Sequence, residues 1–355
     1  MVRKRIMYFD YLRVAATISV VVLHVSAQNW YSFNGRSFEW NVFNFYDSIV
    51  RWGVPIFLMI SGSLFLYRDI EIKNLYRKYI LRLFVAYCFW ALFYAVYSPI
   101  IDSIIGKGFA LPIKSIIKNT ISGNYHMWFI PMIIGTYMCI PIIKQIINNK
   151  KITEYYLILS FIFAFLVPQL VNMSCDFIGG LFHSGIVTIS QVVSKMNRNL
   201  VLGYTFYFVL GYYLGNTKLN KKQKVAVYIS GLLGFLSTVL LNAMVAWETQ
   251  KPCQTYYNNF SINVLLEAIV VYIWFKNKNY DGRKINGLIS KLSKYSFGAY
   301  LVHAFVIDML HRAGLNTVRF SPIISVPIIS SITVFVSYMI SYTIHRIPII
   351  NKWIV

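Results

Sequence analysis

Three ionisable side chains interrupt the apolar N-terminal stretch MVRKRIMYFDYLRVAATISVVVLHVSAQ, namely Asp10, Arg13 and His24. Each costs a few kcal/mol or more inside a bilayer unless it is paired or hydrated. Together with Thr17 they fall within about 60° of one another on a helix, and Arg13 and His24 are roughly 16 Å apart along its axis. The stripe indicates a polar path that faces a helix bundle. The alternative to such a path is that Asp10 and Arg13 form an ion pair at the membrane interface and that His24 is a separate core histidine.

Histidine and arginine together offer general-base catalysis with stabilisation of a developing negative charge. A hydroxyl is a poor nucleophile near neutral pH and needs a positioned base, for which neutral imidazole is well suited. A guanidinium nearby can stabilise the oxyanion that forms when the hydroxyl attacks a carbonyl. The sequence has no H-E-x-x-H, no paired aspartates and no cysteine pair at ligand spacing, so we expect no metal site.

Arg51 and Glu267 are charged residues inside two other apolar stretches. Arg51 opens RWGVPIFLMISGSLF at about the depth of His24, where it either stabilises an oxyanion or extends outward to water. The small residues Ser61 and Gly62 in this stretch favour close helix packing. Glu267, about one-third into INVLLEAIVVYIWF, needs a partner such as Arg or His.

Two further motifs place polar or aromatic groups near the same depth. YHMWFIPMIIG carries His126 and Trp128 at the start of an apolar segment, although a tryptophan there is most often an interfacial anchor. SKYSFGAYLVHAF places Tyr300 and His303 on one helical stripe with Ser296. We therefore expect these residues to support or line the polar path.

The composition defines the class of protein in which these residues must work. The chain of 355 residues is 57% hydrophobic and 13% charged, with a mean hydropathy of +0.56. Apolar stretches near twenty residues recur, which is typical of an integral membrane protein. The net charge of +22 comes from short basic clusters between apolar runs. That distribution is a topogenic signal and not a nucleic-acid surface, so we expect no nucleic-acid partner.

The sequence predicts an all-α polytopic protein with about ten transmembrane helices in one domain, 1–355, without an appended soluble domain. The predicted segments are 8–28, 48–67, 80–101, 127–147, 155–172, 200–217, 225–247, 261–276, 295–313 and 322–344. Most of the 34 lysines and arginines then fall on the side of the N-terminus, so both termini should be cytoplasmic.

The longer predicted loops lie outside, at 29–47, 102–126 and 173–199. In the second, LPIKSIIKNTIS is amphipathic and suits the outer membrane interface. Cys175 and Cys253 also fall outside in this topology, where they can either pair or remain free.

Five motifs occur in order: FDYLRVAATISVVVLH, GVPIFLMISGSLF, HMWFIPMIIGTYM, FYFVLGYYLG and SFGAYLVHAF. With them the whole chain resembles the acyltransferase-3 family of bacterial membrane O-acyltransferases. The resemblance implies a multi-pass protein of the bacterial plasma membrane. It would move an acyl group, usually acetyl, from cytoplasmic acyl-CoA to an envelope glycan or another hydroxyl outside. The family's catalytic arginine and histidine match Arg13 and His24.

One motif departs from the family pattern of two closely spaced arginines. Here LYRKYILRLF supplies Arg77, Lys78 and Arg82. The resemblance assigns these residues to binding of the CoA phosphates. The positive-inside rule explains them equally well. We expect an acetyl-CoA-dependent O-acyltransferase acting on an envelope polysaccharide. A small hydroxyl acceptor such as serine is an alternative. So is a proton-coupled transporter or flippase of a glycan or metabolite.

Overall fold

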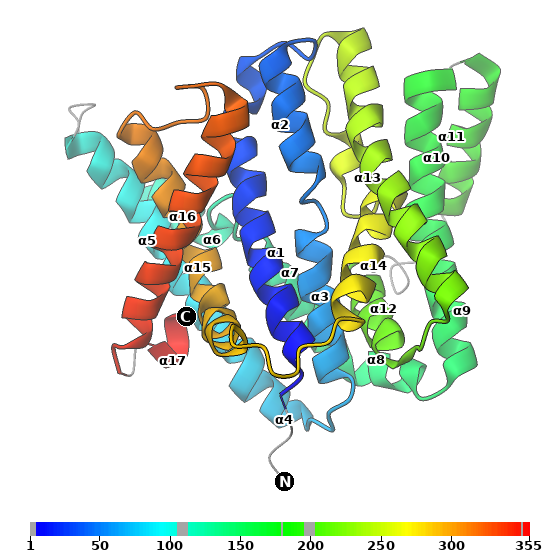
Figure 1. The fold of residues 1–355 in the computed structure, drawn as a ribbon, viewed down its shortest axis with the longest axis horizontal. Helices are drawn as coiled ribbons and strands as arrows, with labels where there is room; N and C mark the ends of the chain where they lie inside the picture. Colours follow the sequence, from blue (N-terminus) through cyan, green and yellow to red (C-terminus); the bar gives the residue numbers. More distant parts are fainter. Residues whose placement is uncertain (1–4, 105–112, 179, 195–202, 349–350) are drawn as a thin grey trace.

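The computed structural model describes residues 5–104, 113–178, 180–194, 203–348 and 351–355. Residues 200–202 of the predicted segment 200–217 lie outside this range. All regular elements in these ranges are helices, and they stand side by side as a bundle (Figure 1). The predicted all-α class is confirmed for this part of the chain.

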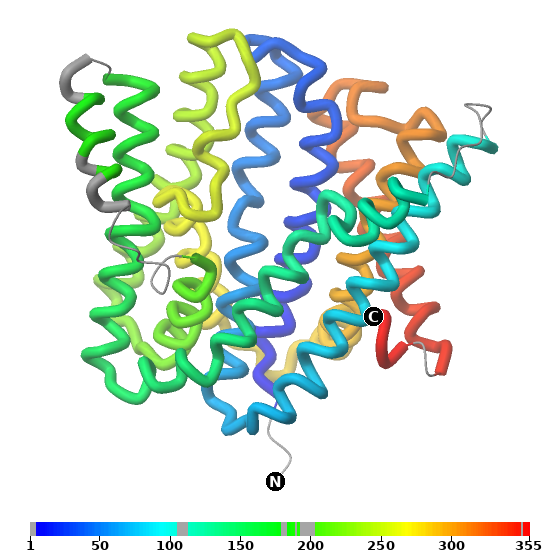
Figure 2. Tube along the Cα trace, turned by 180° about the vertical axis from the view of Figure 1, so that it is seen from behind, coloured from blue at the N-terminus to red at the C-terminus, as the bar shows by residue number. Residues whose placement is uncertain are grey.

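Helix α1 (Met7–Ser26) lies in the middle of the bundle. It packs against α15 (Asn286–Arg312), α3 (Gly53–Phe65) and α16 (Pro322–His345). The other long helices are α5 (Leu81–Ile104), α13 (Lys221–Thr249) and α14 (Ile262–Lys276). The view from behind shows the segment of α6 (Ile113–Ser122) and α7 (Phe129–Met138) passing in front of α1 (Figure 2).

Shorter elements complete the described chain. The α-helices are α2 (Phe38–Ser48), α4 (Ile72–Asn74), α8 (Ile140–Ile147), α9 (Lys150–Ser160), α10 (Val167–Met173), α11 (Gly180–Ser194), α12 (Thr205–Asn216) and α17 (Asn351–Ile354). The 3₁₀-helices are η1 (Trp30–Ser32) and η5 (Thr255–Tyr257). The π-helices are η2 (Leu75–Ile80), η3 (Phe161–Leu166) and η4 (Ser174–Ile178).

Seven helical stretches within the described ranges are long and apolar enough to span a membrane. The number rises to eight if α7 and α8, bent by 58°, form one span. Pro141 at the start of α8 accounts for the bend, because proline cannot continue the hydrogen bonding of the preceding helix. All ten predicted segments contain helix. However, α12 has 12 residues, about 18 Å, which is shorter than the hydrocarbon core. The count of ten and the side of the termini stay predictions.

Two of the predicted outer loops are partly helical, which corrects the sequence interpretation. Residues 38–47 of the predicted loop 29–47 belong to α2, whose N-terminus is capped by the Ser37 hydroxyl accepting from Trp40 N. The predicted loop 173–199 contains η4 and α11. Polar residues such as Asn44 and Asp47 conceal the helix in α2, because they face other helices and not water. Cys175 and Cys253 are free thiols, so no disulfide joins them.

The predicted amphipathic segment forms helix α6. Ile113, Ile117 and Ile121 occur at four-residue intervals and are exposed, and none of the residues of α6 is buried. The helix is tied to α5 by the Tyr87 hydroxyl, which donates to the carbonyl of Ile121 at 2.7 Å. Such an exposed apolar stripe is what a helix lying on a membrane surface requires.

Helices α3 and α12 cross with their backbones in contact, which explains two glycines. A Cβ atom on Gly62 would lie 1.8 Å from the carbonyl oxygen of Phe208, and one on Gly211 would lie 2.1 Å from that of Met59. The Ser63 hydroxyl donates across the crossing to the Gly211 carbonyl at 2.7 Å. Small residues therefore set the closest helix contact in this half of the bundle.

We expect Gly211→Ala to separate α3 from α12 and to destabilise the protein by about 1–3 kcal/mol, the usual cost of overpacking. A Cβ atom on Gly135 in α7 would meet no heavy atom within 4 Å, so Gly135→Ala is a matched control. The measurement is the thermal unfolding midpoint of each variant purified in detergent. Equal midpoints for the two variants would contradict the close crossing.

Candidate active site

A cavity of about 160 Å³ follows α1 through the centre of the bundle. It is enclosed mainly by α1, α3, α7 and α15, and most of its wall is apolar. Arg13 lies at one end, and His24 lies at the other, eleven residues further along α1. Of the residues singled out from the sequence, His126, Trp128 and Tyr300 also line this cavity.

Three imidazole rings meet at the His24 end of the cavity. The ring of His303 stacks on that of His24 with centroids 5.1 Å apart, and it lies 4.9 Å from that of His126. His126 and His303 are fully buried. The sequence placed the three histidines on separate segments, and the structure brings them together.

The hydrogen bonds of the two buried histidines identify which nitrogen is free. His303 Nδ1 lies 2.5 Å from the carbonyl oxygen of Tyr300, which can only accept, so Nδ1 carries the proton. His126 Nδ1 lies 3.1 Å from Oδ1 of Asn124 and donates in the same way. In the neutral rings Nε2 is then an acceptor, and in both residues it is buried without a hydrogen-bond partner among the described residues.

His24 differs from the other two histidines because it is partly exposed and makes no hydrogen bond within the described part of the chain. Its ring contacts Tyr125 at 5.2 Å in addition to His303. A general base must be able to form a hydrogen bond with the group whose proton it takes. His24 is therefore the most accessible histidine of this cluster.

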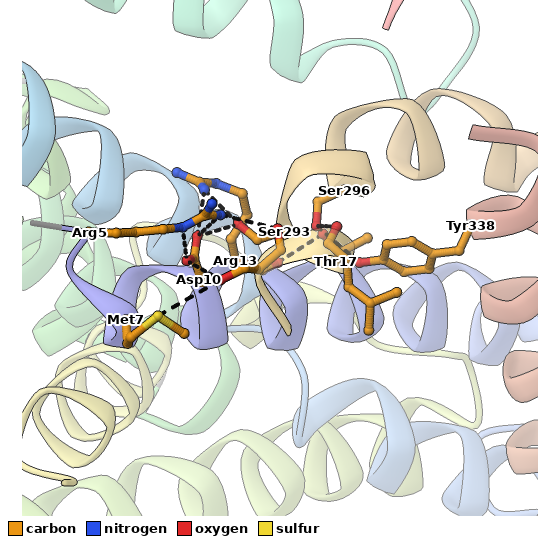
Figure 3. A network of polar contacts seen from close by, with 10 residues as sticks. Arg5, Met7, Asp10, Arg13, Thr17, Ser293, Ser296 and Tyr338 are labelled. Carbon is orange, nitrogen blue, oxygen red and sulfur yellow. Dashed lines mark hydrogen bonds and ion pairs between the residues drawn. The ribbon is translucent and has the colours of Figure 1, made fainter. Parts of the chain in front are cut away.

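Arg13 is held at the opposite end by a network that joins α1 to α15 (Figure 3). Its Nη1 donates to Ser293 Oγ at 2.7 Å, and Ser293 in turn donates to Asp10 Oδ1 at 2.7 Å. Asp10 also forms an ion pair with Arg13 at 3.6 Å and accepts two hydrogen bonds from Arg5, at 2.5 and 3.0 Å. These contacts neutralise a carboxylate that is 4% exposed.

The predicted polar stripe of α1 faces other helices over its whole length. Thr17 is buried, and its hydroxyl donates to the Arg13 carbonyl at 2.9 Å. Beside it, Ser296 of α15 and Tyr338 of α16 are hydrogen-bonded at 3.0 Å (Figure 3). Asp10 and Thr17 are thus buried among helices, while a continuous polar path from Arg13 to His24 stays a prediction, because most of the cavity wall is apolar.

A second, wider cavity of about 710 Å³ adjoins the N-terminal end of α1. Arg13 lines both cavities, so it lies where they meet. The lining of the wide cavity includes the basic residues Arg5, Arg68 and Lys276 and one acidic residue, Asp10. We call this wide cavity the basic vestibule.

The basic cluster singled out from the sequence lies elsewhere. Arg77 and Lys78 are exposed in η2, and Arg82 donates to the backbone oxygen of Val355 at 2.6 Å. None of the three lines either cavity. Arg68 was not singled out from the sequence as a site residue. It lies just after the motif GVPIFLMISGSLF, separated from it by Leu66 and Tyr67.

Arg51 is half-buried and does not line this cavity. Its guanidinium forms an ion pair with Asp47, whose side chain is 1% exposed, and stacks over the ring of Tyr257 at 4.0 Å. Asp47 was missed because the sequence placed it in a loop.

Glu267 is also buried, with 3% of its surface exposed, and lies away from the cavity lining. Its Oε1 accepts a hydrogen bond from Thr238 at 2.5 Å, whereas an Arg or His partner was expected from the sequence. Asn263 donates to the same threonine at 2.8 Å. Glu267 is therefore part of the packing between α13 and α14. Among the described residues, no cluster of His, Cys, Asp or Glu side chains has the geometry to hold a metal ion.

The apolar helices and the histidine–arginine cavity together define a multi-pass membrane protein with an internal site suited to base catalysis. Residues 6–342 match the model of a family described as an acyltransferase domain, and the chain belongs to this acyltransferase-3 family. Membership supports an acyltransferase activity and confirms the resemblance seen in the sequence.

Curated relatives carry a different name. The chain is 25% identical over 311 residues to the "Probable poly-beta-1,6-N-acetyl-D-glucosamine export protein" of Staphylococcus aureus strain MSSA476. The matched region covers 84% of this chain and 82% of the relative. The protein of that name from strain MRSA252 is 25% identical over 310 residues, with the same shares covered. No solved structure matches the chain.

The Asp47–Arg51 pair predicts a specific pattern of stability. Asp47→Asn leaves the buried guanidinium without a counter-charge, and we expect a loss of about 3 kcal/mol. Adding Arg51→Gln should restore part of that loss, because it removes the guanidinium that was left without a counter-charge. Unfolding midpoints of the two single variants and the double variant in detergent check this. Additive losses in the double variant would show that the two charges do not depend on each other.

Proposed function

We propose that this protein is a membrane O-acyltransferase. It transfers an acyl group, acetyl in the simplest case, from acyl-CoA on the cytoplasmic side to a hydroxyl of an envelope polysaccharide at the outer face. The observation that carries the proposal is the cavity along α1, which begins at Arg13 beside the basic vestibule and ends at the unpartnered His24.

The basic vestibule suits the CoA portion of the donor. Arg5, Arg68 and Lys276 supply positive charge to a cavity whose volume is in the range of small-molecule sites. CoA is too large and too charged to cross lipid, so its phosphates must remain on the cytoplasmic side. The thin pantetheine arm can pass Arg13 and enter the narrower cavity, which carries the thioester roughly 16 Å along α1 to His24.

The reaction at His24 is a balanced transfer. The imidazole nitrogen takes the proton of the acceptor hydroxyl while the hydroxyl oxygen bonds to the thioester carbonyl carbon. The carbon–sulfur bond of the tetrahedral intermediate then breaks, and the CoA sulfur receives the proton from His24. An ester and free CoA result. Arg51 is paired with Asp47 and does not line the cavity, so it is not assigned a direct contact with the oxyanion.

The name of the staphylococcal relatives supports a polysaccharide acceptor and also raises export as a second candidate function. The narrow cavity of about 160 Å³ favours transfer over export. A sugar polymer passing through the bundle would need a wider path.

We expect purified protein to release CoA from labelled acetyl-CoA in a manner that depends on a polysaccharide acceptor. His24→Ala should reduce this release by about a hundredfold or more, the usual contribution of a general base, with an unchanged unfolding midpoint. Near-normal release by His24→Ala would remove the mechanism. Glycan movement across vesicles without any release of CoA by the unaltered protein would favour export instead.

The KM for acetyl-CoA can distinguish which of two basic clusters binds the donor. Arg68→Ala should raise the KM for acetyl-CoA about tenfold and leave the KM for the acceptor unchanged, because a charge-assisted hydrogen bond to phosphate contributes about 1.5–3 kcal/mol. The matched control is the double variant Arg77→Ala/Lys78→Ala, which removes two exposed charges outside the vestibule. If only the double variant raised the KM for acetyl-CoA, the CoA site would instead lie at the basic cluster first singled out in the sequence.

A further inference from the structure

Two groups at the His24 end of the cavity have no part in the reaction described above. His126 lines the cavity and is 1% exposed, and its Nε2 has no hydrogen-bond partner among the described residues. Trp128 lines the same cavity but is 41% exposed. Trp128 is therefore the more accessible of the two side chains, and His126 is enclosed.

The orientation of His126 is fixed before any ligand arrives. Its Nδ1 donates to Asn124, and its backbone carbonyl accepts a hydrogen bond from the Tyr300 hydroxyl at 2.6 Å. The ring also contacts those of Tyr94 at 5.1 Å and His303 at 4.9 Å. Nε2 is thus a preorganised acceptor, and a ligand that donates a hydrogen to it would satisfy a buried polar atom.

This end of the cavity carries no counter-charge for an ionic acceptor. Apart from the histidines, the lining residues near His24 are apolar or aromatic, and Arg13 lies at the opposite end. The charges of Arg51 and Asp47 are paired with each other. A free amino acid would have to bury its ammonium and carboxylate here without partners, which is costly.

We infer that His126 and Trp128 form the acceptor subsite, and that the acceptor is a neutral pyranose sugar with a second polar hydrogen beside the reacting hydroxyl. The indole of Trp128 covers the apolar face of the ring, His126 Nε2 accepts from the neighbouring hydroxyl or amide N–H, and His24 takes the reacting hydroxyl. The inference rests on the proposed function and disfavours serine as the acceptor.

Direct binding tests the subsite without requiring turnover. The probe is a neutral N-acetylglucosamine oligosaccharide titrated into the purified full-length protein, with L-serine as the ionic comparison. We expect Trp128→Ala and His126→Phe each to weaken oligosaccharide binding at least tenfold, and Trp128→Phe to retain most of it. Trp353→Ala is the matched control, because Trp353 is equally exposed at 41% and lies outside the cavity lining.

The same variants in the CoA-release assay should show a raised KM for the oligosaccharide and an unchanged KM for acetyl-CoA. Unchanged oligosaccharide binding in Trp128→Ala, with a folded protein by its unfolding midpoint, would overturn the subsite. Tighter binding or faster acylation of serine than of the sugar would also overturn it. Sugar binding that depends on Trp128 without any CoA release would instead refute the proposed transferase and leave the subsite standing.

Discussion

The buried contact of Asp10 and Arg13 with Ser293 is the constraint on which the site depends. A carboxylate inside the bundle must be paired, and its partners come from α1 itself and from α15. The network therefore fixes both the rotation of α1 and its register against α15. The two helices run in the same direction. From Arg13 to His24 is about 16 Å and from Ser293 to His303 about 15 Å, so the contact at one end brings the two imidazoles to the same level at the other.

The two ends of the cavity have opposite electrostatic character, and this separation suits a reaction between unlike substrates. Arg5, Arg13 and Arg68 gather where an anionic donor would enter. The wall at the His24 end consists mainly of imidazoles, aromatic rings and apolar side chains, and Arg51 is paired with Asp47. A phosphate-bearing molecule is therefore attracted to one end and not to the other. Two buried carboxylates in the described part of the chain, Asp10 and Asp47, are each paired with an arginine.

Spacing along one helix was sufficient to predict the polar stripe of α1, since Asp10, Arg13 and His24 share a face in any straight helix. Contacts between segments were beyond the sequence. Nothing local indicates that His126 and His303 meet His24, or that Arg68 borders the vestibule and Arg82 instead binds Val355. Asp47 was hidden for a different reason. The polar residues of α2 resemble a loop in hydropathy, although they bind within the bundle. The short length of α12 could not be predicted, because composition does not define where a helix begins and ends.

The position of Arg13 where the two cavities meet has a consequence for the membrane itself. A water-filled passage through the bundle would let protons and other cations leak and would dissipate the membrane potential. A guanidinium fixed at the junction places a positive charge in the path of any such ion, and an arginine in a narrow pore is an effective barrier to cations. Ser293 and Asp10 hold Arg13 in place through contacts within the protein. An internal cavity bounded by a fixed guanidinium is therefore poorly suited to conduct cations.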